Sequence, residues 1–313
     1  MSNTILGFYA LPHELLSNET CFGKEIEITI LGMRGKICFP NIKDEIIPNE
    51  ERNPILICPI EGESWWNEPR GNETEWGRVV SFPHYSAYIS KIILKFDNIT
   101  QEDVKNIYDN IYNWFNKFYK LKEIITEQSI YYSNTDITQT TPPIDFYKYN
   151  SELERLHIDG ENHISMTVTV GNNGLSFEDY KKIIVCTNSP KQISFEYDKY
   201  RLAIEALDKK DYASVVVNGA VSIEKALITK IKETCTNKGV LFDKLSEKYR
   251  TLGGVFALAE ALQIPLPTTD YKTKIINLRN KVVHDGYPPQ KREAFEFLRE
   301  TKTYLETYSN IIE

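Results

Sequence analysis

A histidine and an arginine stand five residues apart near the C-terminal end of the chain. Histidine is the side chain type that titrates near neutrality, so His284 is a candidate for general acid–base catalysis. Arg279 carries a permanent positive charge that stabilises anions, and Asn280 beside it can hydrogen-bond a phosphate or orient the pair. These residue types can move a proton and stabilise a developing negative charge without a metal or other cofactor.

Two charged residues interrupt the apolar faces of expected helices. Glu224 lies in the middle of the apolar face of a helix at residues 210–235, and Arg279 does the same in a helix at residues 268–284. Because an isolated charge in a core is costly, we expect the two side chains to meet. Their contact either fixes the helix register as a buried ion pair or holds the guanidinium in a cleft that faces an anion.

The helical spacing leaves two ways to assemble a site. Asn280 and His284 are four residues apart and share a face, whereas Arg279 is about 140° away from His284 around an ideal helix. Either the long arginine side chain reaches a histidine at a frayed helix end, or two chains pair across a symmetry axis and bring both motifs into one groove.

These residues resemble the Arg-Asn-x-x-x-His motif of the HEPN superfamily. The chain reads Arg279, Asn280, Lys281, Val282, Val283, His284, and then Asp285 and Gly286. An acidic residue on an Ala/Val-rich second helix, here Glu224, is also typical of these domains. The resemblance covers about 120 residues and implies a helical bundle with the motif near the end of the penultimate helix. It also implies the two-chain arrangement of the site.

The function that this resemblance implies is metal-independent RNA cleavage. The 2′-hydroxyl of RNA is the nucleophile, and the products carry a 2′,3′-cyclic phosphate and a 5′-hydroxyl. Such domains, fused to an N-terminal module, often act as bacterial toxins or abortive-infection effectors against phage, so we expect RNA, an antitoxin or a phage-derived trigger as partners. In one branch a tyrosine two residues after the histidine is modified by a partner enzyme. In this chain Tyr287 lies three residues after His284, so the sequence departs from the pattern of that branch. The alternative is a catalytically silent HEPN module that dimerises or binds nucleotide.

The elements that must position these residues form an expected α+β chain. A β-rich N-terminal domain with one long helix is expected at residues 1–190, and an all-helical bundle at residues 191–313. The expected strands are at residues 25–31, 36–40, 55–60, 78–82, 89–96, 165–170 and 182–186, with a helix from Thr100 to about Gln128. The expected bundle helices are at residues 196–208, 210–235, 240–263, 268–284 and 289–311, the last starting with Pro288 and Pro289.

Composition points to a cytoplasmic protein with free thiols. The sequence holds five scattered cysteines, no paired cysteine motif and no apolar run long enough for a membrane span. From Phe195 onward the net charge is +2, whereas the preceding residues carry −9, so only the C-terminal part is suited to a polyanion. The segment from His157 to His163 fits a polar hairpin turn better than a metal site. Trp65, Trp66 and Trp76 are either an exposed recognition surface or part of the β core.

Overall fold

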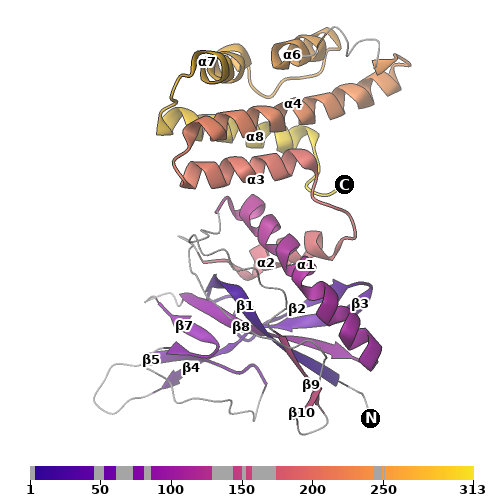
Figure 1. The fold of residues 1–313 in the computed structure, drawn as a ribbon, viewed down its shortest axis with the longest axis vertical. Coiled ribbons are helices and arrows are strands. Elements are labelled where there is room, and N and C mark those ends of the chain that lie inside the picture. Colours follow the sequence, from indigo (N-terminus) through magenta and orange to yellow (C-terminus); the bar gives the residue numbers. More distant parts are fainter. Residues whose placement is uncertain are drawn as a thin grey trace. The chain divides into compact units, whose positions relative to one another are not determined.

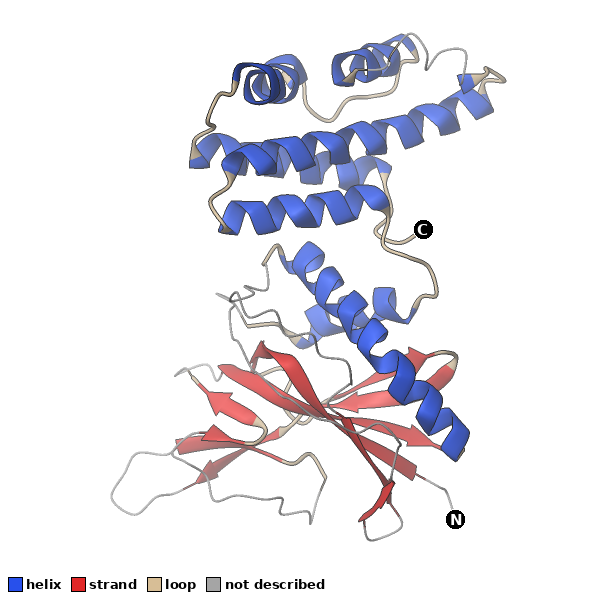
Figure 2. Cartoon of the chain, in the orientation of Figure 1, coloured by secondary structure: helices blue, strands red, loops and turns tan. Residues whose placement is uncertain are grey.

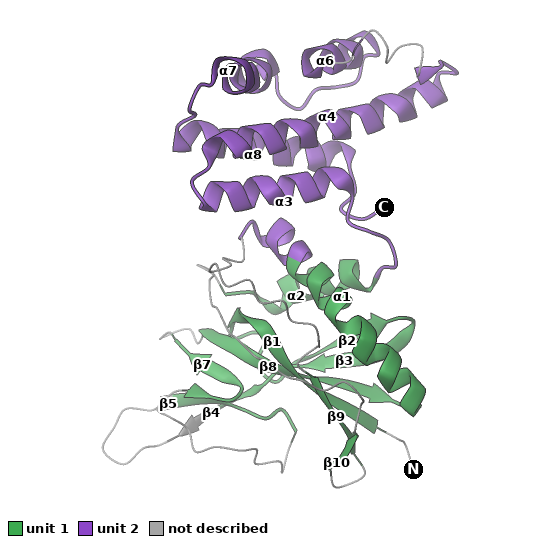
Figure 3. Cartoon of the chain, viewed as in Figure 1, with its two compact units in different colours: residues 1–119, 130–188 green, residues 120–129, 189–313 purple. Residues whose placement is uncertain are grey.

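The chain folds into two compact units. The computed structural model describes residues 4–45, 53–60, 73–80, 86–128, 144–149, 153–156, 174–242, 249 and 251–313 (Figure 1). Unit 1 comprises residues 1–119 and 130–188, and unit 2 comprises residues 120–129 and 189–313 (Figure 3). Unit 1 contains an antiparallel sheet with a long helix, and unit 2 is helical (Figure 2). The α+β class predicted from the sequence is therefore confirmed.

An antiparallel sheet forms the body of unit 1. Its strand order is β10-β9-β1-β8-β3-β2, and β7 pairs with β8 and with β6, while β4 and β5 form a separate two-stranded sheet. The strands are β1 (Thr4–Asn18), β2 (Glu25–Ile30), β3 (Met33–Cys38), β4 (Asn41–Glu45), β5 (Asn53–Ile57), β6 (Glu73–Thr74), β7 (Gly77–Val79), β8 (Ser86–Asp97), β9 (Ile144–Tyr149) and β10 (Leu153–Leu156). The predicted hairpin is present as β2 and β3, with Glu25 paired to Cys38.

Strand β1 lies in the interior of this sheet, between β9 and β8, and was not predicted from the sequence. Gly7 and Pro12 interrupt its pattern, and both residue types weaken a strand prediction. In the structure a β-carbon at Gly7 would lie 2.8 Å from the Phe146 ring, so the glycine permits close packing. Pro12 falls where the pairing with β8 shifts between Ala10 and Leu15, a position at which a proline costs no ladder hydrogen bond.

The long helix α1 (Gln101–Thr126) confirms the helix predicted after Thr100. Thr100 and Asp103 form reciprocal hydrogen bonds of 2.8 and 3.2 Å, which satisfy backbone donors at the helix start. Along the part of α1 in unit 1, Phe115 stacks on Tyr9 of β1 with ring centroids 4.2 Å apart. The last turns of α1, at residues 120–126, belong to unit 2, where Ile124 joins a hydrophobic cluster with α3 and α8 residues.

The strand predicted at residues 182–186 is wrong, because this segment lies within helix α2 (Phe177–Asn188). Its buried residues are Tyr180, Ile183, Ile184 and Thr187, which recur at helical spacing. Ser176 and Asp179 exchange hydrogen bonds of 2.9 and 3.2 Å and cap the helix start. The strand predicted at residues 165–170 lies outside the described residues.

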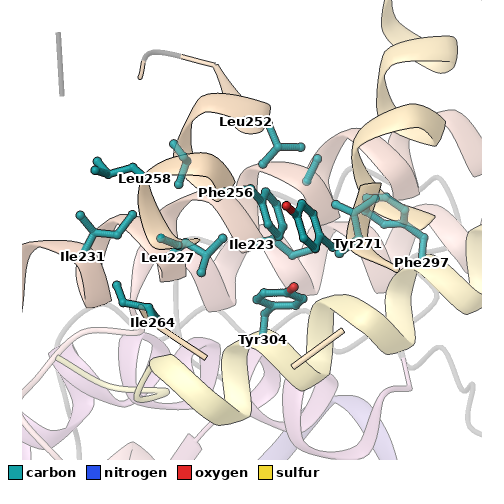
Figure 4. Packing of buried hydrophobic residues seen from close by; sticks show 14 of the residues in the cluster. Ile223, Leu227, Ile231, Leu252, Phe256, Leu258, Ile264, Tyr271, Phe297 and Tyr304 are labelled. Carbon is teal, nitrogen blue, oxygen red and sulfur yellow. The ribbon is translucent and has the colours of Figure 1, made fainter. Parts of the chain in front are cut away.

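The helices of unit 2 pack around α4. They are α3 (Phe195–Asp208), α4 (Tyr212–Asn237), α6 (Leu252–Ala261), the π-helix η1 (Lys272–Asn277), α7 (Leu278–Asp285) and α8 (Lys291–Tyr308). One side of α4 joins a cluster with α6, η1, α7 and α8, in which Phe256 stacks on Tyr271 at 4.5 Å (Figure 4). Other α4 residues, including Val215 and Ala226, join a second cluster with α3 and α8. Among the described residues, no helix is long and apolar enough to cross a membrane.

Several boundaries in unit 2 differ from the predicted ones. Of the helix predicted at residues 240–263, residues 252–261 form α6, which begins after Thr251, whose side chain accepts a hydrogen bond from the Gly254 amide. Residues 243–248 and 250 lie outside the described residues. The last helix begins after Gln290, so Pro288 and Pro289 precede its N-cap instead of occupying its first turn. Both differences arise because a capping side chain, which the apolar periodicity does not reveal, determines where the helix starts.

Candidate active site

The candidate site is carried by a helix whose first part is a π-helix. Tyr271 opens this helix, the wider π-helical turns of η1 follow, and α7 continues directly from Leu278. Ile275 and Val282 are buried against the core shared with α4, α6 and α8. Tyr271 is held by stacking on Phe256 and by a hydrogen bond of 2.6 Å to Glu260. π-helical turns are rare and occur often at functional sites, where they change which side chains share a face.

The end of α7 fixes the position of the histidine. Gly286 adopts a left-handed conformation, with φ 65° and ψ 25°, and the Tyr287 amide donates to the Lys281 carbonyl at 3.1 Å. This pattern ends the helix immediately after Asp285, because few residues other than glycine adopt that conformation without cost. His284 therefore lies in the last helical turn and not in a frayed segment.

The residues after the helix end are tied to α8. The Tyr287 hydroxyl donates to the Glu293 carboxylate at 3.0 Å, and the Gln290 amide donates to the same group at 2.8 Å. The hydrogen bond from Tyr287 to Glu293 raises the pKa of the phenol. Because one carboxylate accepts both bonds, it holds the chain that follows His284 against the start of α8.

Arg279, Asn280 and His284 converge within one chain. The Arg279 Nη1 atom donates to Asn280 Oδ1 at 3.1 Å and lies 3.2 Å from His284 Nε2. Arginine cannot accept a hydrogen bond, so the imidazole nitrogen must be the acceptor, with its proton on the other ring nitrogen. The long arginine side chain covers the separation around the helix, although the helix end is not frayed at His284, as the first of the two arrangements had assumed. The single-chain site is therefore geometrically complete for these three residues.

The ion pair predicted between Glu224 and Arg279 is not formed. Within the described part of the chain, no contact of 4.0 Å or less joins the two side chains. Burial raises the pKa of Glu224, and the positive charge of Arg279 opposes that shift, which places the two groups near each other without direct contact. The guanidinium instead points at His284. The prediction assumed two fully buried charges, whereas both residues are only half-buried.

The site is accessible and its positive charge is not neutralised by a carboxylate. Asn280 and His284 are exposed, and Arg279 has no carboxylate within 4.0 Å among the residues that the structure describes. Lys281, one turn before Asp285, is also exposed. This arrangement offers a guanidinium to an incoming anion and an unprotonated imidazole nitrogen to a proton.

The other candidates from the sequence receive less support. Trp76 is 2% exposed and contacts Phe8, so it belongs to the β core, whereas Trp65 and Trp66 lie outside the described residues. The segment from His157 to His163 lies outside them as well. Across the described ranges, no group of three or more potential metal ligands occurs.

Comparison of the chain with protein-family models, with curated proteins and with solved structures found no match in any of the three.

Proposed function

We propose that Arg279, Asn280 and His284 form the active site of a metal-independent endoribonuclease of the HEPN type. The observation that carries the proposal is the 3.2 Å contact between Arg279 Nη1 and His284 Nε2 at an accessible helix end. A histidine that only capped the helix would direct its ring at the free carbonyl groups. Here its ring nitrogen meets a guanidinium that forms no ion pair with any described carboxylate, which is the pairing expected where a phosphate binds and reacts.

The proposed reaction needs two proton transfers and one site for negative charge. A base removes the proton of the RNA 2′-hydroxyl, whose oxygen bonds to phosphorus as the bond from phosphorus to the 5′-oxygen breaks. An acid protonates that leaving oxygen, giving a 2′,3′-cyclic phosphate and a 5′-hydroxyl. Arg279 stabilises the additional negative charge on the phosphate oxygens, and Asn280 positions the guanidinium. As the phosphate draws Arg279 away, the Nε2 atom of His284 becomes free to accept a proton.

A second copy of the chain supplies the second proton-transfer group. Each chain contributes one histidine to the site, whereas the reaction needs a base and an acid. A homodimer with its two-fold axis near the α7 helices places two copies of His284 beside one phosphate. The packed helices α4 and α7 each expose a valine, Val217 at 39% and Val283 at 43%, which is suitable surface for such a contact. The dimer is needed to supply a second proton-transfer group, because the arginine and the histidine already meet within one chain.

The proposed biological role follows from the resemblance to HEPN proteins alone. It is that of a bacterial toxin or abortive-infection effector, acting on RNA in the cytoplasm under the control of an antitoxin or a phage-derived trigger. The N-terminal unit would sense the trigger, recruit a partner or restrain the helical unit. Unit 2 carries the larger share of basic residues, which suits contact with RNA.

The experiment is incubation of the purified chain with total RNA, beside His284→Ala and the matched control Lys281→Ala. His284 and Lys281 are both exposed on α7, so neither substitution should alter the fold. We expect wild-type and Lys281→Ala chains to cut RNA in the presence of EDTA, leaving cyclic phosphate and 5′-hydroxyl ends. We expect His284→Ala to lose cleavage and any toxicity to growing cells. Full activity in His284→Ala, or loss of wild-type activity on chelation, would contradict the mechanism. Nucleotide binding without cleavage would favour the silent HEPN module.

A further inference from the structure

The sheet of unit 1 has two faces with different surroundings. Side chains alternate along a strand, so Tyr9, which stacks on α1, points away from the face that carries Leu6. Leu6 is paired with Lys95 of β8, and Lys95 is paired in turn with Lys36 of β3. This second face therefore carries a lysine on an interior strand of the sheet, where apolar residues are usual when a face is covered.

A cavity of about 280 Å³ lies on this second face. Its floor includes Leu6 and Ile93, which are 2% and 0% exposed. Lys24, Glu25 and Lys95 add charged groups, and Tyr149 adds an aromatic side chain at the end of β9. A concave site with an apolar floor and a few convergent polar groups is the usual form of a small-molecule site, and this volume is near the lower end of the usual range.

The wall of the cavity is preformed by backbone hydrogen bonds. The Phe39 amide donates to the Lys24 carbonyl at 3.0 Å, and the Gly23 amide donates to the Pro40 carbonyl at 2.9 Å. Gly23 has φ 65°, and a β-carbon there would lie 2.5 Å from the Asn41 side chain. These bonds hold the segment that carries Lys24 and Glu25 in place, so binding would require little reordering.

Among the described residues, the charges that line the cavity, Lys24, Lys95 and Glu25, leave a positive excess. Glu25 is paired with Lys36 at 2.6 Å, and that hydrogen bond lowers the pKa of its carboxyl, with a smaller contribution from Lys95. Lys95 is half-buried, and no carboxylate lies within 4.0 Å of its ammonium group among the described residues. Lys91 on the same strand is, by contrast, paired with Glu75 at 2.7 Å. An unpaired, partly buried cation is a binding partner for an anion.

The thiol that lines the cavity is not a reactive nucleophile. Cys38, which carries it, is 6% exposed and lies 3.6 Å from Glu25. Burial, assisted by the negative charge of Glu25, raises the pKa of this thiol to about 12, so it stays protonated at neutral pH.

We propose that this cavity binds a small organic anion, whose charged group meets Lys95 and Lys24 and whose apolar body covers Leu6 and Ile93. A carboxylate and a phosphate share this chemistry. The site is distinct from Arg279 and His284, and the inference does not depend on ribonuclease activity. It assigns to the N-terminal unit the capacity to recognise a metabolite-sized molecule.

The test is calorimetric titration of the full chain with three probes that share one apolar body. These are 2-naphthoate, 2-naphthyl phosphate and the neutral 2-naphthamide. We expect one site that binds at least one of the anions about tenfold or more tightly than the amide. The reason is that a hydrogen bond between charged groups adds binding free energy that the neutral amide lacks. The preferred anion distinguishes a carboxylate ligand from a phosphate ligand. Equal binding of all three probes, or no binding, would overturn the proposal.

Three variants connect the binding to the cavity. Lys95→Met keeps the aliphatic chain and should reduce anion affinity toward that of the amide, with Lys24 left as the remaining cation. Glu25→Gln removes a negative charge and should raise anion affinity by about threefold. Lys91→Met, on the same strand but outside the cavity, should leave anion affinity unchanged.

Thermal unfolding of each variant checks its fold. Glu25 is exposed, so Glu25→Gln keeps the proposal falsifiable even if Lys95→Met does not fold. Equal anion affinity in Glu25→Gln and wild type would place the binding elsewhere.

Discussion

Arg201 on α3 and Arg279 on α7 carry the same guanidinium in different surroundings. The Arg201 side chain is 14% exposed and contacts three carboxylates, those of Glu123 and Asp198 at 3.2 Å and that of Glu205 at 3.4 Å. Burial acts against its charged form, yet the carboxylates raise its pKa. Arg279 is half-buried, meets no carboxylate within 4.0 Å in the described ranges, and donates instead to Asn280 and His284.

The difference separates a structural arginine from one that is available to a ligand. Three carboxylates already satisfy the charge of Arg201, so another anion would be repelled. The neutral acceptors around Arg279 orient its guanidinium without cancelling its charge, and a phosphate can replace them. A neighbouring imidazole adds a proton acceptor at Arg279 that is lacking at Arg201. Making the same substitution at both positions therefore tests whether each arginine contributes to catalysis or to stability.

The largest expected effect is on catalysis at Arg279. Arg279→Lys keeps a positive charge but loses the planar group that contacts Asn280 and His284 together, so the rate of RNA cleavage should fall by about 10²–10³-fold. Arg201→Lys, the matched control, should cleave RNA at the wild-type rate. Single-turnover cleavage of a labelled RNA measures both rates. A wild-type rate in Arg279→Lys would remove this residue from the site.

The reverse pattern is expected for stability. Arg201→Met removes the guanidinium that three carboxylates share, one of them the 5%-exposed carboxylate of Glu123. The free energy of unfolding should fall by about 3 kcal/mol. This value is at the lower end of the usual cost of breaking a buried ion pair, because part of the cluster is exposed. Arg279→Met should change it by less than about 1 kcal/mol. Denaturant unfolding provides both values. A larger loss in Arg279→Met than in Arg201→Met would make Arg279 the structural residue of the two.

A smaller effect is expected when active and inactive chains are mixed. If each active dimer needs two copies of His284, equal amounts of wild-type and His284→Ala chains should show about a quarter of the wild-type activity, whereas dilution alone would leave about half. The chains must be mixed under conditions that allow exchange. Mixing with Lys281→Ala chains, which keep His284, should leave activity unchanged. A monomer by light scattering that cleaves RNA at full rate would refute the dimer.

The sequence predicted the parts of the helical unit that depend on local periodicity. The helices expected at residues 196–208 and 210–235 correspond to α3 and α4, because apolar spacing and the Asp211 cap are local signals. It also selected Arg279 and His284 by residue type and spacing. It could not predict that the two would touch, since that contact depends on the rotamer of the arginine side chain.

Other features depend on packing between distant segments. Val215 and Val216 are both fully buried, because α4 packs against two clusters and its buried face is wider than one apolar stripe, whereas the next residue, Val217, is 39% exposed. Strand β1 pairs with two strands that are distant in sequence, which overrides its glycine and proline. The cavity around Lys95 combines residues from several strands, and no local pattern indicates it.

The smallest expected effect concerns Glu224, the residue predicted to pair with Arg279. Burial raises the pKa of its carboxyl, so the protonated form is favoured in the folded chain. Binding of this proton stabilises the folded state below the ordinary glutamate pKa of about 4.3. The stabilisation is lost as the pH rises through the raised pKa that Glu224 has in the folded state. At neutral pH the ionised group therefore costs stability, and Glu224→Gln should raise the free energy of unfolding. The gain should shrink as the pH falls toward about 4.3.

Arg279 opposes this shift, so removing it sharpens the measurement. In an Arg279→Met background the gain from Glu224→Gln at neutral pH should be larger than in the wild-type chain, because the attraction that partly stabilises the carboxylate is lost. Glu233→Gln, on the exposed side of the same helix, should change the free energy of unfolding by no more than a few tenths of a kcal/mol, about the value of a surface ion pair. Urea unfolding between pH 5 and 7 measures the series. Destabilisation by Glu224→Gln at pH 7 would instead mean that attraction to Arg279 outweighs burial, and would restore the ion pair that the sequence predicted.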